Sequence, residues 1–379
     1  MPSRQVEMGN RMYHVVVVGA GPAGSAAAKR CAERGFKTLL LEKKKLPRDK
    51  ICSGMVMGPL TKNIITQEFG EIPHEVLVAP HYLSGFLLVA PGVDPQRIDN
   101  EMPLAWRKDL DYWMNLKAKE KGVEIWDGAK VTAASERAGE CTVAVQRDGE
   151  RQDLKARFVI GADGAASAIR KSLFPKLEVE YTQVSTRECY EGELNIDKKY
   201  YHWFLYKGVV APRFSAHHKG NNLLLQVSLK VGQKLTEIRD EARQFLAEGY
   251  GFDLKWKPLW RDGCLAGAEL GDELLSGSFL PAKGNILLVG DAAGLQLPPM
   301  GEGIGAALKT GLLAANSISN AIELKKAASE VYFQELARFL AALRSLDSLT
   351  KQAKAESAKG LRAFLKGLRI AWDESLKIT

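Results

Sequence analysis

Cys52 stands in a short basic segment, PRDKICSGM at residues 47–55, with Arg48 and Lys50 ahead of it. The thiolate is the reactive form of cysteine, and cations that lie close to a thiol lower its pKa. A lone cysteine is also commonly a small buried apolar side chain. Both interpretations stay open from this segment alone: Cys52 is either a thiol at a reaction centre or a packing residue.

A glycine-rich segment precedes it, YHVVVVGAGPAGSAAAKRCAERGFKTLLLEKK at residues 13–44, with the pattern of a strand, a turn, a helix and a second strand. The first glycine permits the tight turn, the second lets the backbone approach a pyrophosphate, and the third allows close helix packing. The helix N-terminus offers free N–H groups to that anion, and an acidic residue after the second strand can bind the ribose. The predicted dinucleotide-binding residues here are Gly19, Gly21, Ala23, Gly24 and Glu42.

The whole chain has an ordinary globular composition, 46% apolar and 26% charged in 379 residues, which suits one large unit or two interleaved domains. Its five cysteines include no C-x-x-C pair, so neither a disulfide framework nor a metal site is indicated, and a reducing compartment is favoured. The net charge of +8 is spread along the chain without a dense basic block, which argues against a nucleic-acid partner. We find no signal peptide and no apolar run of roughly 20 residues, and expect a cytoplasmic protein or one peripheral to a membrane.

The segment from 351 to 379 carries seven basic and three acidic residues. Its apolar residues recur at helical spacing, as expected for an amphipathic helix: Leu361, Phe364, Leu365, Leu368, Trp372 and Leu376. Such a helix either lies on an anionic membrane surface or packs against the body of the protein, and we favour packing slightly.

Two further motifs follow, ARFVIGADGAASAIRKSL with Asp163 and NILLVGDAAGLQLPPMGEGIGAALKTG with Asp291. In this order and spacing, the three segments resemble the flavoprotein superfamily typified by p-hydroxybenzoate hydroxylase. That resemblance implies bound FAD, with Asp291 at the ribitol chain. It also implies that a short run carries the backbone past the isoalloxazine ring, namely Pro298, Gly301, Gly303 and Ile304.

Simple physical arguments agree with this assignment. Glycines let backbone amides approach a flat ring, and the positive end of the helix that opens at this point suits the negative charge of reduced flavin. The resemblance also gives Arg107 to the FAD phosphates, which suits a guanidinium fork, and the backbone of Val131 to the adenine. Lys43 and Arg48 are further candidates at the ribose and phosphate end, although either could equally be a solvated charge.

The resemblance implies an α/β fold: an FAD-binding Rossmann-like domain of the glutathione reductase and p-hydroxybenzoate hydroxylase type, an inserted mixed β-sheet substrate domain and a C-terminal helical region. No second complete G-x-G-x-x-G follows a strand, so we expect NADPH or reduced ferredoxin to act as a transient electron donor. The expected limits are 1–71, 104–175 and 276–320 for the FAD-binding domain, 72–103 and 176–275 for the substrate domain, and 321–379 for the helical region.

Within the superfamily, two segments resemble the geranylgeranyl reductase family. PRDKICSGM resembles that family's basic stretch and Cys-Gly-Gly beside the flavin, with Ser53 in place of the first glycine. YYHWFLYKG resembles its Tyr-x-Trp-x-Phe-Pro substrate-pocket motif. Tyr201 and Trp203 match this motif, whereas Leu205 and Tyr206 replace its Phe and Pro.

This resemblance implies reduction of isolated C=C bonds in an isoprenoid chain. Hydride passes from reduced FAD to one carbon and an acid supplies a proton to the other, while an apolar tunnel holds the unactivated bond. Cys52, expected near the flavin, either relays the proton or shapes the pocket. The other candidate acids, each of which also suits a structural role, are His81, Tyr82, His202 and Tyr206.

Two other functions use the same FAD segments. An aromatic monooxygenase is the first alternative. An electron-transfer flavoprotein that serves a quinone or a protein partner is the second, and the absence of a cysteine cluster for an iron–sulfur centre disfavours it. Flavin halogenases are disfavoured as well, because WFLYKG lacks their Trp-x-Trp-x-x-Pro signature.

Overall fold

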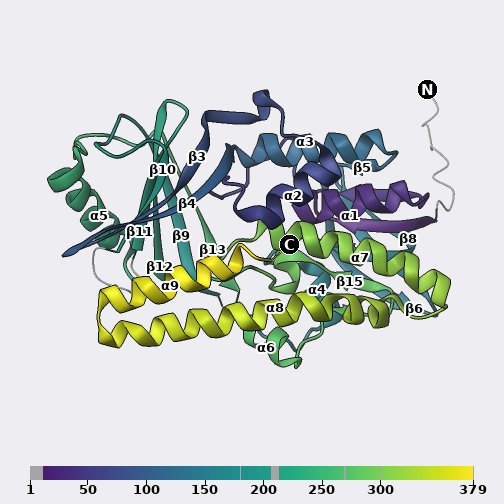
Figure 1. Cartoon of the computed structure of the whole chain (residues 1–379). Helices are drawn as coiled ribbons and strands as arrows, with labels where there is room; N and C mark the ends of the chain where they lie inside the picture. Colours follow the sequence, from purple (N-terminus) through teal and green to yellow (C-terminus); the bar gives the residue numbers. More distant parts are fainter. Residues whose placement is uncertain (1–11, 180, 206–212, 269, 300, 379) are drawn as a thin grey trace, which may run out of the picture.

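Two β-sheets with covering helices make up the described part of the chain (Figure 1). The structure is a computed structural model, and it describes residues 12–179, 181–205, 213–268, 270–299 and 301–378. The mixed α/β architecture with C-terminal helices confirms the fold class predicted from the sequence. The domain limits given above stay predictions.

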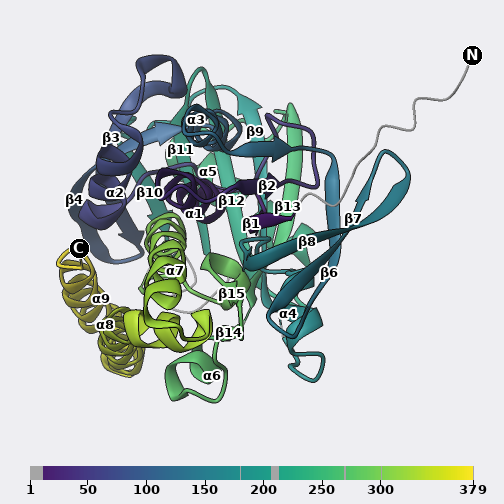
Figure 2. The ribbon, with the colours of Figure 1, turned by 90° about the vertical axis from the view of Figure 1, so that its right-hand side faces the viewer.

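The first sheet contains the predicted dinucleotide-binding unit. β1, α1 and β2 form a parallel βαβ unit at its centre, and β5, β2, β1, β8 and β15 run parallel in that order. β6 and β7 continue it as an antiparallel ribbon with β8, which projects from the molecule in Figure 2. The strands are β1 (Tyr13–Val18), β2 (Thr38–Leu41), β5 (Glu124–Trp126), β6 (Ala129–Arg137), β7 (Glu140–Arg147), β8 (Glu150–Gly161), β14 (Ala282–Lys283) and β15 (Ile286–Leu288).

Small residues let helices pack closely on this sheet. A Cβ on Gly311 would lie 2.3 Å from the backbone oxygen of Ala23, so α7 and α1 meet almost backbone to backbone. The helices around this sheet are α1 (Pro22–Glu33), α2 (Gly58–Phe69), α3 (Arg107–Glu120), α4 (Ala168–Leu173) and α7 (Ile304–Leu324), with a short 3-10 helix η2 (Gly290–Ala293).

The second sheet has seven strands in the order β13-β9-β12-β11-β10-β3-β4. It is mixed, because β10 pairs with β3 in parallel and the other neighbours are antiparallel. The strands are β3 (Leu77–Ala90), β4 (Val93–Ala105), β9 (Tyr181–Glu191), β10 (Tyr200–Phe204), β11 (Arg213–Lys219), β12 (Asn222–Lys230) and β13 (Trp260–Ala268). The 3-10 helix η1 (His74–Val76) leads into β3, and α5 (Leu235–Tyr250) covers one face of the sheet.

The C-terminal helices connect the two halves. α8 (Ala328–Glu356) runs along both sheets, and α9 (Leu361–Ser375) turns back beside it (Figure 1). The short helix η3 (Ser357–Lys359) lies between α8 and α9, and α6 (Gly271–Ser276) lies earlier in the chain and packs against α8. The apolar stripe of α9 packs against the face of the second sheet opposite α5, which confirms the prediction that this helix packs on the protein.

Candidate active site

The glycine turn between β1 and α1 is built around two glycines that the fold requires. Gly19 has φ of +104°, and a Cβ there would lie 2.3 Å from the oxygen of Ala162. A Cβ on Gly24 would lie 1.8 Å from the oxygen of Gly19. Gly21 is different, because its Cβ would meet only the Arg48 guanidinium, at 3.5 Å. No side chain caps α1 at Gly21, so the described backbone leaves an open anion-binding end at that helix.

Glu42 lies at the end of β2, where its buried carboxylate accepts a hydrogen bond from the Ala20 amide at 3.1 Å. Arg48 donates to the same carboxylate through Nε at 2.9 Å. Its Nη1 lies 3.2 Å from Asp111 of α3. Glu42 and Arg48 therefore frame the open end of α1, whereas Lys43 is exposed.

Arg107 continues this line of charges. Its guanidinium is buried and forms a bidentate pair with Asp111, at 2.7 and 2.9 Å, and its charge lowers the pKa of the Cys52 thiol. Alternating charges thus connect Glu42 to Cys52 by way of Arg48, Asp111 and Arg107. The contact between Arg107 and FAD phosphates stays a prediction.

The other predicted cofactor residues lie around the same edge of the first sheet. Asp163 caps α4 through Oδ2, 2.7 Å from the Ala168 amide, while its buried Oδ1 has no partner among the described residues. Val131 is buried on β6. Asp291 accepts a hydrogen bond from the Gln296 side chain at 3.2 Å, and a Cβ on Gly303 would lie 3.5 Å from its Oδ1.

A closed loop precedes α7. Leu297 and Glu302 exchange two backbone hydrogen bonds, at 2.8 and 3.0 Å, and Gly301 within this loop has φ of +69°. α7 then begins at Ile304 with Gly303 as its N-cap. The uncapped end of α1, the unpartnered oxygen of Asp163 and this glycine loop are the features that a bound FAD would use, so the described residues fit the cofactor.

A polar corner forms where the loop of Cys52 meets the second sheet. Lys219 of β11 is fully buried and its ammonium donates to the backbone oxygens of Ser53 and of Ala105, the latter at 2.8 Å. The same ammonium lies 4.2 Å from the centre of the Trp106 ring. Arg187 of β9 donates to the backbone oxygen of Cys52, so two cations of the second sheet hold this loop in place.

These contacts set the protonation of the corner. Burial alone would raise the pKa of the Cys52 thiol, but Arg107, the Gly54 amide and Lys219 together hold that pKa below its ordinary value. Burial lowers the pKa of Lys219 to about 7, although Cys52 opposes the shift. The corner therefore makes the Cys52 thiol easier to deprotonate than an ordinary thiol, and it makes Lys219 lose its proton more readily than an ordinary lysine.

The two faces of the second sheet differ in chemistry, since side chains alternate along each strand. Tyr201 and Trp203 point to the face that carries α9, where the described apolar side chains form one cluster. We call this the α9 cluster: Met55, Leu83, Phe86, Leu88, Ala90, Ile98, Met102, Leu104, Tyr201, Trp203, Leu205, Phe364, Leu365, Leu368 and Trp372. Tyr201 also hydrogen-bonds Ser215 and lies 4.9 Å from the ring of His217, centre to centre.

His202 lies on the opposite face. Its ring stacks at 6.1 Å on Phe204, which packs against α5, and burial lowers its pKa. His202 is therefore separated by the sheet from Tyr201 and Trp203, because successive residues of a strand point to opposite faces. Among the other candidate acids, Tyr82 is 47% exposed and His81 stacks on His74 at 4.2 Å. Tyr206 lies outside the described residues.

Sequence reasoning missed three buried titratable residues. Lys219 and His217 share the face of Tyr201, a relation that the period of two along β11 would have given once the pairing of β10 with β11 was known. Both ring nitrogens of buried His217 lack a partner among the described residues. Glu302 lies inside the glycine-rich motif before α7, between Gly301 and Gly303, and no local pattern marks it as buried.

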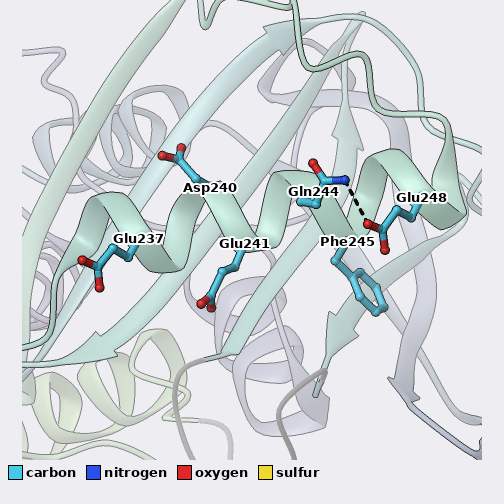
Figure 3. Close-up of a pocket in the computed structure, with 6 residues that line it drawn as sticks. All are labelled: Glu237, Asp240, Glu241, Gln244, Phe245 and Glu248. Atoms are coloured by element: carbon cyan, nitrogen blue, oxygen red, sulfur yellow. Dashed lines mark hydrogen bonds between the residues drawn. The ribbon is translucent and has the colours of Figure 1, made fainter.

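A surface hollow in the described part of the chain lies elsewhere. It is an open depression of about 550 Å³ on α5, lined by Glu237, Asp240, Glu241, Gln244, Phe245 and Glu248. Figure 3 shows these side chains on one helix, with a single hydrogen bond from Gln244 to Glu248. This depression lies on the α5 side of the second sheet, away from the α9 cluster, and we assign it no role in the chemistry.

Comparison with known proteins agrees with this geometry. Residues 14–176, which include the glycine turn, Glu42, Arg107 and Asp163, match the family described as FAD dependent oxidoreductase. The chain is an FAD-dependent oxidoreductase. This match confirms the cofactor class predicted from the three motifs.

Relatives and a solved structure extend the similarity over most of the enzyme. A digeranylgeranylglycerophospholipid reductase of Methanocaldococcus jannaschii is 28% identical over 325 residues, which cover 83% of this chain and 79% of the relative. A geranylgeranyl diphosphate reductase of Rhodobacter capsulatus is 27% identical over 328 residues, covering 80% and 74%. A geranylgeranyl bacteriochlorophyll reductase-like protein of Thermoplasma acidophilum has the same fold, with a TM-score of 0.72, 19% identity and coverage of 97% and 89%. The resemblance to geranylgeranyl reductases is thereby confirmed.

Among the described residues, no helix combines the length and the apolar character needed to cross a bilayer. In the same part of the chain, no group of three or more His, Cys, Asp or Glu side chains is placed to hold a metal ion.

Proposed function

We propose that this enzyme saturates isolated C=C bonds of an isoprenoid chain. The observation that carries the proposal is the α9 cluster, an apolar and aromatic region that extends from Met55, three residues after Cys52, along the second sheet to α9. Relatives named for reductases of geranylgeranyl groups support the same substrate class. Bound FAD, in its reduced form, would supply hydride to one carbon of the double bond.

An unconjugated alkene has no oxygen on which charge can develop, so the protein must act by positioning and by excluding water. The aromatic side chains of Phe86, Tyr201 and Trp203 give a dry surface along which an isoprenoid chain can lie. In the structure the side chains of α9 fill this region. We therefore propose that an isoprenoid chain takes the place of α9 side chains such as Phe364 and Leu368.

Cys52 is better suited to accept a proton or to carry negative charge than to donate a proton. Arg107 and Lys219 lower the pKa of its thiol and so stabilise the thiolate relative to the thiol. Its loop is fixed by Arg187 and Lys219, so the sulfur is held in one place rather than on a mobile segment. We propose that Cys52 helps to shape the site and contributes negative charge to it.

Two finer proposals concern partners. NADPH or reduced ferredoxin would deliver electrons to the FAD by binding transiently, because the chain has no second complete G-x-G-x-x-G motif after a strand.

The outer face of α9 is exposed and basic, with Arg362, Lys366 and Arg369, and it includes Ile370 at 48% exposure. We propose that this face contacts an anionic membrane surface, which would bring α9 close to lipid-borne isoprenoid chains.

The test is an anaerobic reaction of the chemically reduced holoenzyme with polyprenyl substrates, followed by mass spectrometry. Gain of two hydrogens by the chain together with flavin reoxidation supports the proposal. Oxygen incorporation into an aromatic substrate in air, without chain reduction, would instead establish the monooxygenase alternative. Gly21→Ala tests the cofactor site separately: its Cβ meets only Arg48, so the variant should fold but hold FAD more weakly.

A further inference from the structure

A small cavity separates the glycine loop before α7 from the C-terminal helix. Its volume is about 20 Å³, roughly the space of one water molecule. The apolar residues around it are Met57, Leu60, Leu297, Pro298, Trp372 and Leu376. Trp372 also belongs to the α9 cluster, so the cavity adjoins the region proposed for the isoprenoid chain.

Glu302 is the titratable side chain among the described residues that line this cavity. It is 6% exposed and its carboxyl accepts two hydrogen bonds from the Gly305 amide, at 2.8 and 3.0 Å. The hydroxyl of Thr61, on α2, donates to the same carboxyl at 3.3 Å.

Charged groups on the neighbouring elements are engaged elsewhere. Lys62 of α2 pairs with Glu101, and Arg369 of α9 pairs with Asp373. On the loop itself, Asp291 is bonded to the Gln296 side chain. The protonation of Glu302 is therefore governed by the apolar walls and by its own hydrogen bonds.

These two influences oppose each other. Burial raises the pKa of Glu302 to about 7, although the Gly305 amide and the Thr61 hydroxyl lower it. Near neutral pH the group exists in both forms. It can release a proton, and the amides at the start of α7 then stabilise the carboxylate that remains.

We propose that Glu302 is the proton donor of the double-bond reduction, an inference that rests on the proposed function. The group lies on the loop that the flavoprotein resemblance places along the isoalloxazine, and it faces the apolar cavity that leads to the α9 cluster. Among the candidate acids with a described position, it combines an apolar setting on the substrate side with hydrogen bonds that stabilise its conjugate base.

The reduction adds one hydride and one proton across the double bond. Hydride, supplied by reduced flavin, forms a C–H bond at one alkene carbon, and the π electron pair forms the second C–H bond with the proton of the Glu302 carboxyl. The O–H bond of the carboxyl breaks and its electron pair stays on Glu302. Solvent then returns a proton to the carboxylate before the next turnover.

A purely structural role predicts different behaviour. Glu302 could serve only to cap α7, and Glu302→Gln keeps an oxygen that accepts from Gly305 while it removes the acidic proton. Thr61→Val makes the matched change, because it keeps the acid and removes one hydrogen bond that lowers its pKa.

The experiment compares wild type, E302Q and T61V as FAD-loaded proteins, first by infrared titration of the oxidised enzyme between pH 5 and 9. We expect a protonated carboxyl band that disappears around pH 7 in wild type, at higher pH in T61V, and that is missing in E302Q. Single-turnover reduction of a polyprenyl chain should then fall about 10²- to 10⁴-fold in E302Q. In T61V, the pH at which the rate declines should move upward.

Three results would overturn the inference: an E302Q rate within a few-fold of wild type, an infrared band already absent at pH 5, or a T61V pH profile that does not move. Should E302Q fail to fold, the T61V profile and the wild-type titration still decide the matter. A wild-type enzyme that reduces no polyprenyl chain would instead reject the proposed function. That failure is visible without any variant, so the two cases are distinguishable.

Discussion

The corner around Cys52 and the cavity around Glu302 are both buried, yet they treat an acidic group in opposite ways. At the corner, Arg107 and Lys219 overcome the effect of burial and lower the pKa of the Cys52 thiol. At the cavity, apolar walls prevail over hydrogen bonds from Gly305 and Thr61 and raise the pKa of Glu302. Burial alone therefore does not fix protonation. The balance between desolvation and nearby cations decides whether the pKa of a buried acidic group falls, as at Cys52, or rises, as at Glu302.

Arg107→Ala should have the largest effect on the corner. It removes one partner of a buried ion pair and leaves Asp111 with a single cation, so we expect the free energy of unfolding to fall by about 3–5 kcal/mol. Urea unfolding at pH 7 measures this loss. Arg97→Ala is the matched control, because Arg97 is exposed and pairs with exposed Asp99, and it should change stability little. Equal losses in the two variants would contradict the buried role of Arg107.

Glu302→Gln should flatten the pH dependence of stability. Because the folded-state pKa of about 7 lies above the ordinary value of 4.5, the folded protein binds the proton more tightly than the unfolded chain. The stabilisation is full below the unfolded-state pKa and is lost as pH rises to about 7, by at most ~3 kcal/mol. Urea unfolding from pH 4.5 to 8 measures it. Parallel curves for wild type and E302Q would show that Glu302 is not held as an acid.

Lys219→Met should weaken the corner less than loss of Arg107. The backbone oxygens of Ser53 and Ala105 lose their donor, which costs about 1–3 kcal/mol. Loss of the ammonium also raises the pKa of Cys52, so alkylation of the thiol should require a higher pH than in wild type. The exposed neighbour of Arg107, Lys108, provides the control variant K108M. An unchanged alkylation profile in K219M would separate Lys219 from Cys52.

Trp372→Phe should have the smallest effect. The buried Nε1 of Trp372 has no hydrogen-bond partner among the described residues, so removing it offsets part of the lost contact area. We expect a change in the free energy of unfolding of less than about 1.5 kcal/mol and an unmoved carboxyl band of Glu302. A large shift of that band would mean that the indole, and not the general apolar wall, sets the protonation of Glu302.

What the sequence could predict depends on how far apart along the chain the interacting residues lie. Gly19, Gly24 and Glu42 act through neighbours within one βαβ unit, so their spacing was enough to predict a dinucleotide-binding unit. FAD followed only from the resemblance that the motifs with Asp163 and Asp291 complete. Lys219 reaches Ser53 only because β11 lies beside β10 and the second sheet meets the Cys52 loop. Pairings between segments that far apart in sequence leave no local periodicity to read.

Residue type alone does not tell which face of an element a side chain occupies. Histidine suits proton transfer, but strand alternation directs His202 to the α5 face of the sheet, and its role as an acid stays a prediction. Glutamate is usually solvated, and no local sequence signal shows that Thr61 and the start of α7 enclose Glu302. In both cases the missing information was which face of an element is covered.

The most direct test of this account is one anaerobic turnover of the reduced enzyme with a polyprenyl substrate in deuterated water. The account predicts a product in which one double bond has gained two hydrogen atoms. Deuterium should stand at the carbon that the solvent-exchangeable acid protonates, and also at the other carbon, because the N5–H of reduced flavin exchanges with solvent. Flavin reoxidation should match product formation one to one. The account would be contradicted if every double bond of the polyprenyl chain stayed intact under anaerobic conditions and the flavin reoxidised only after air was admitted.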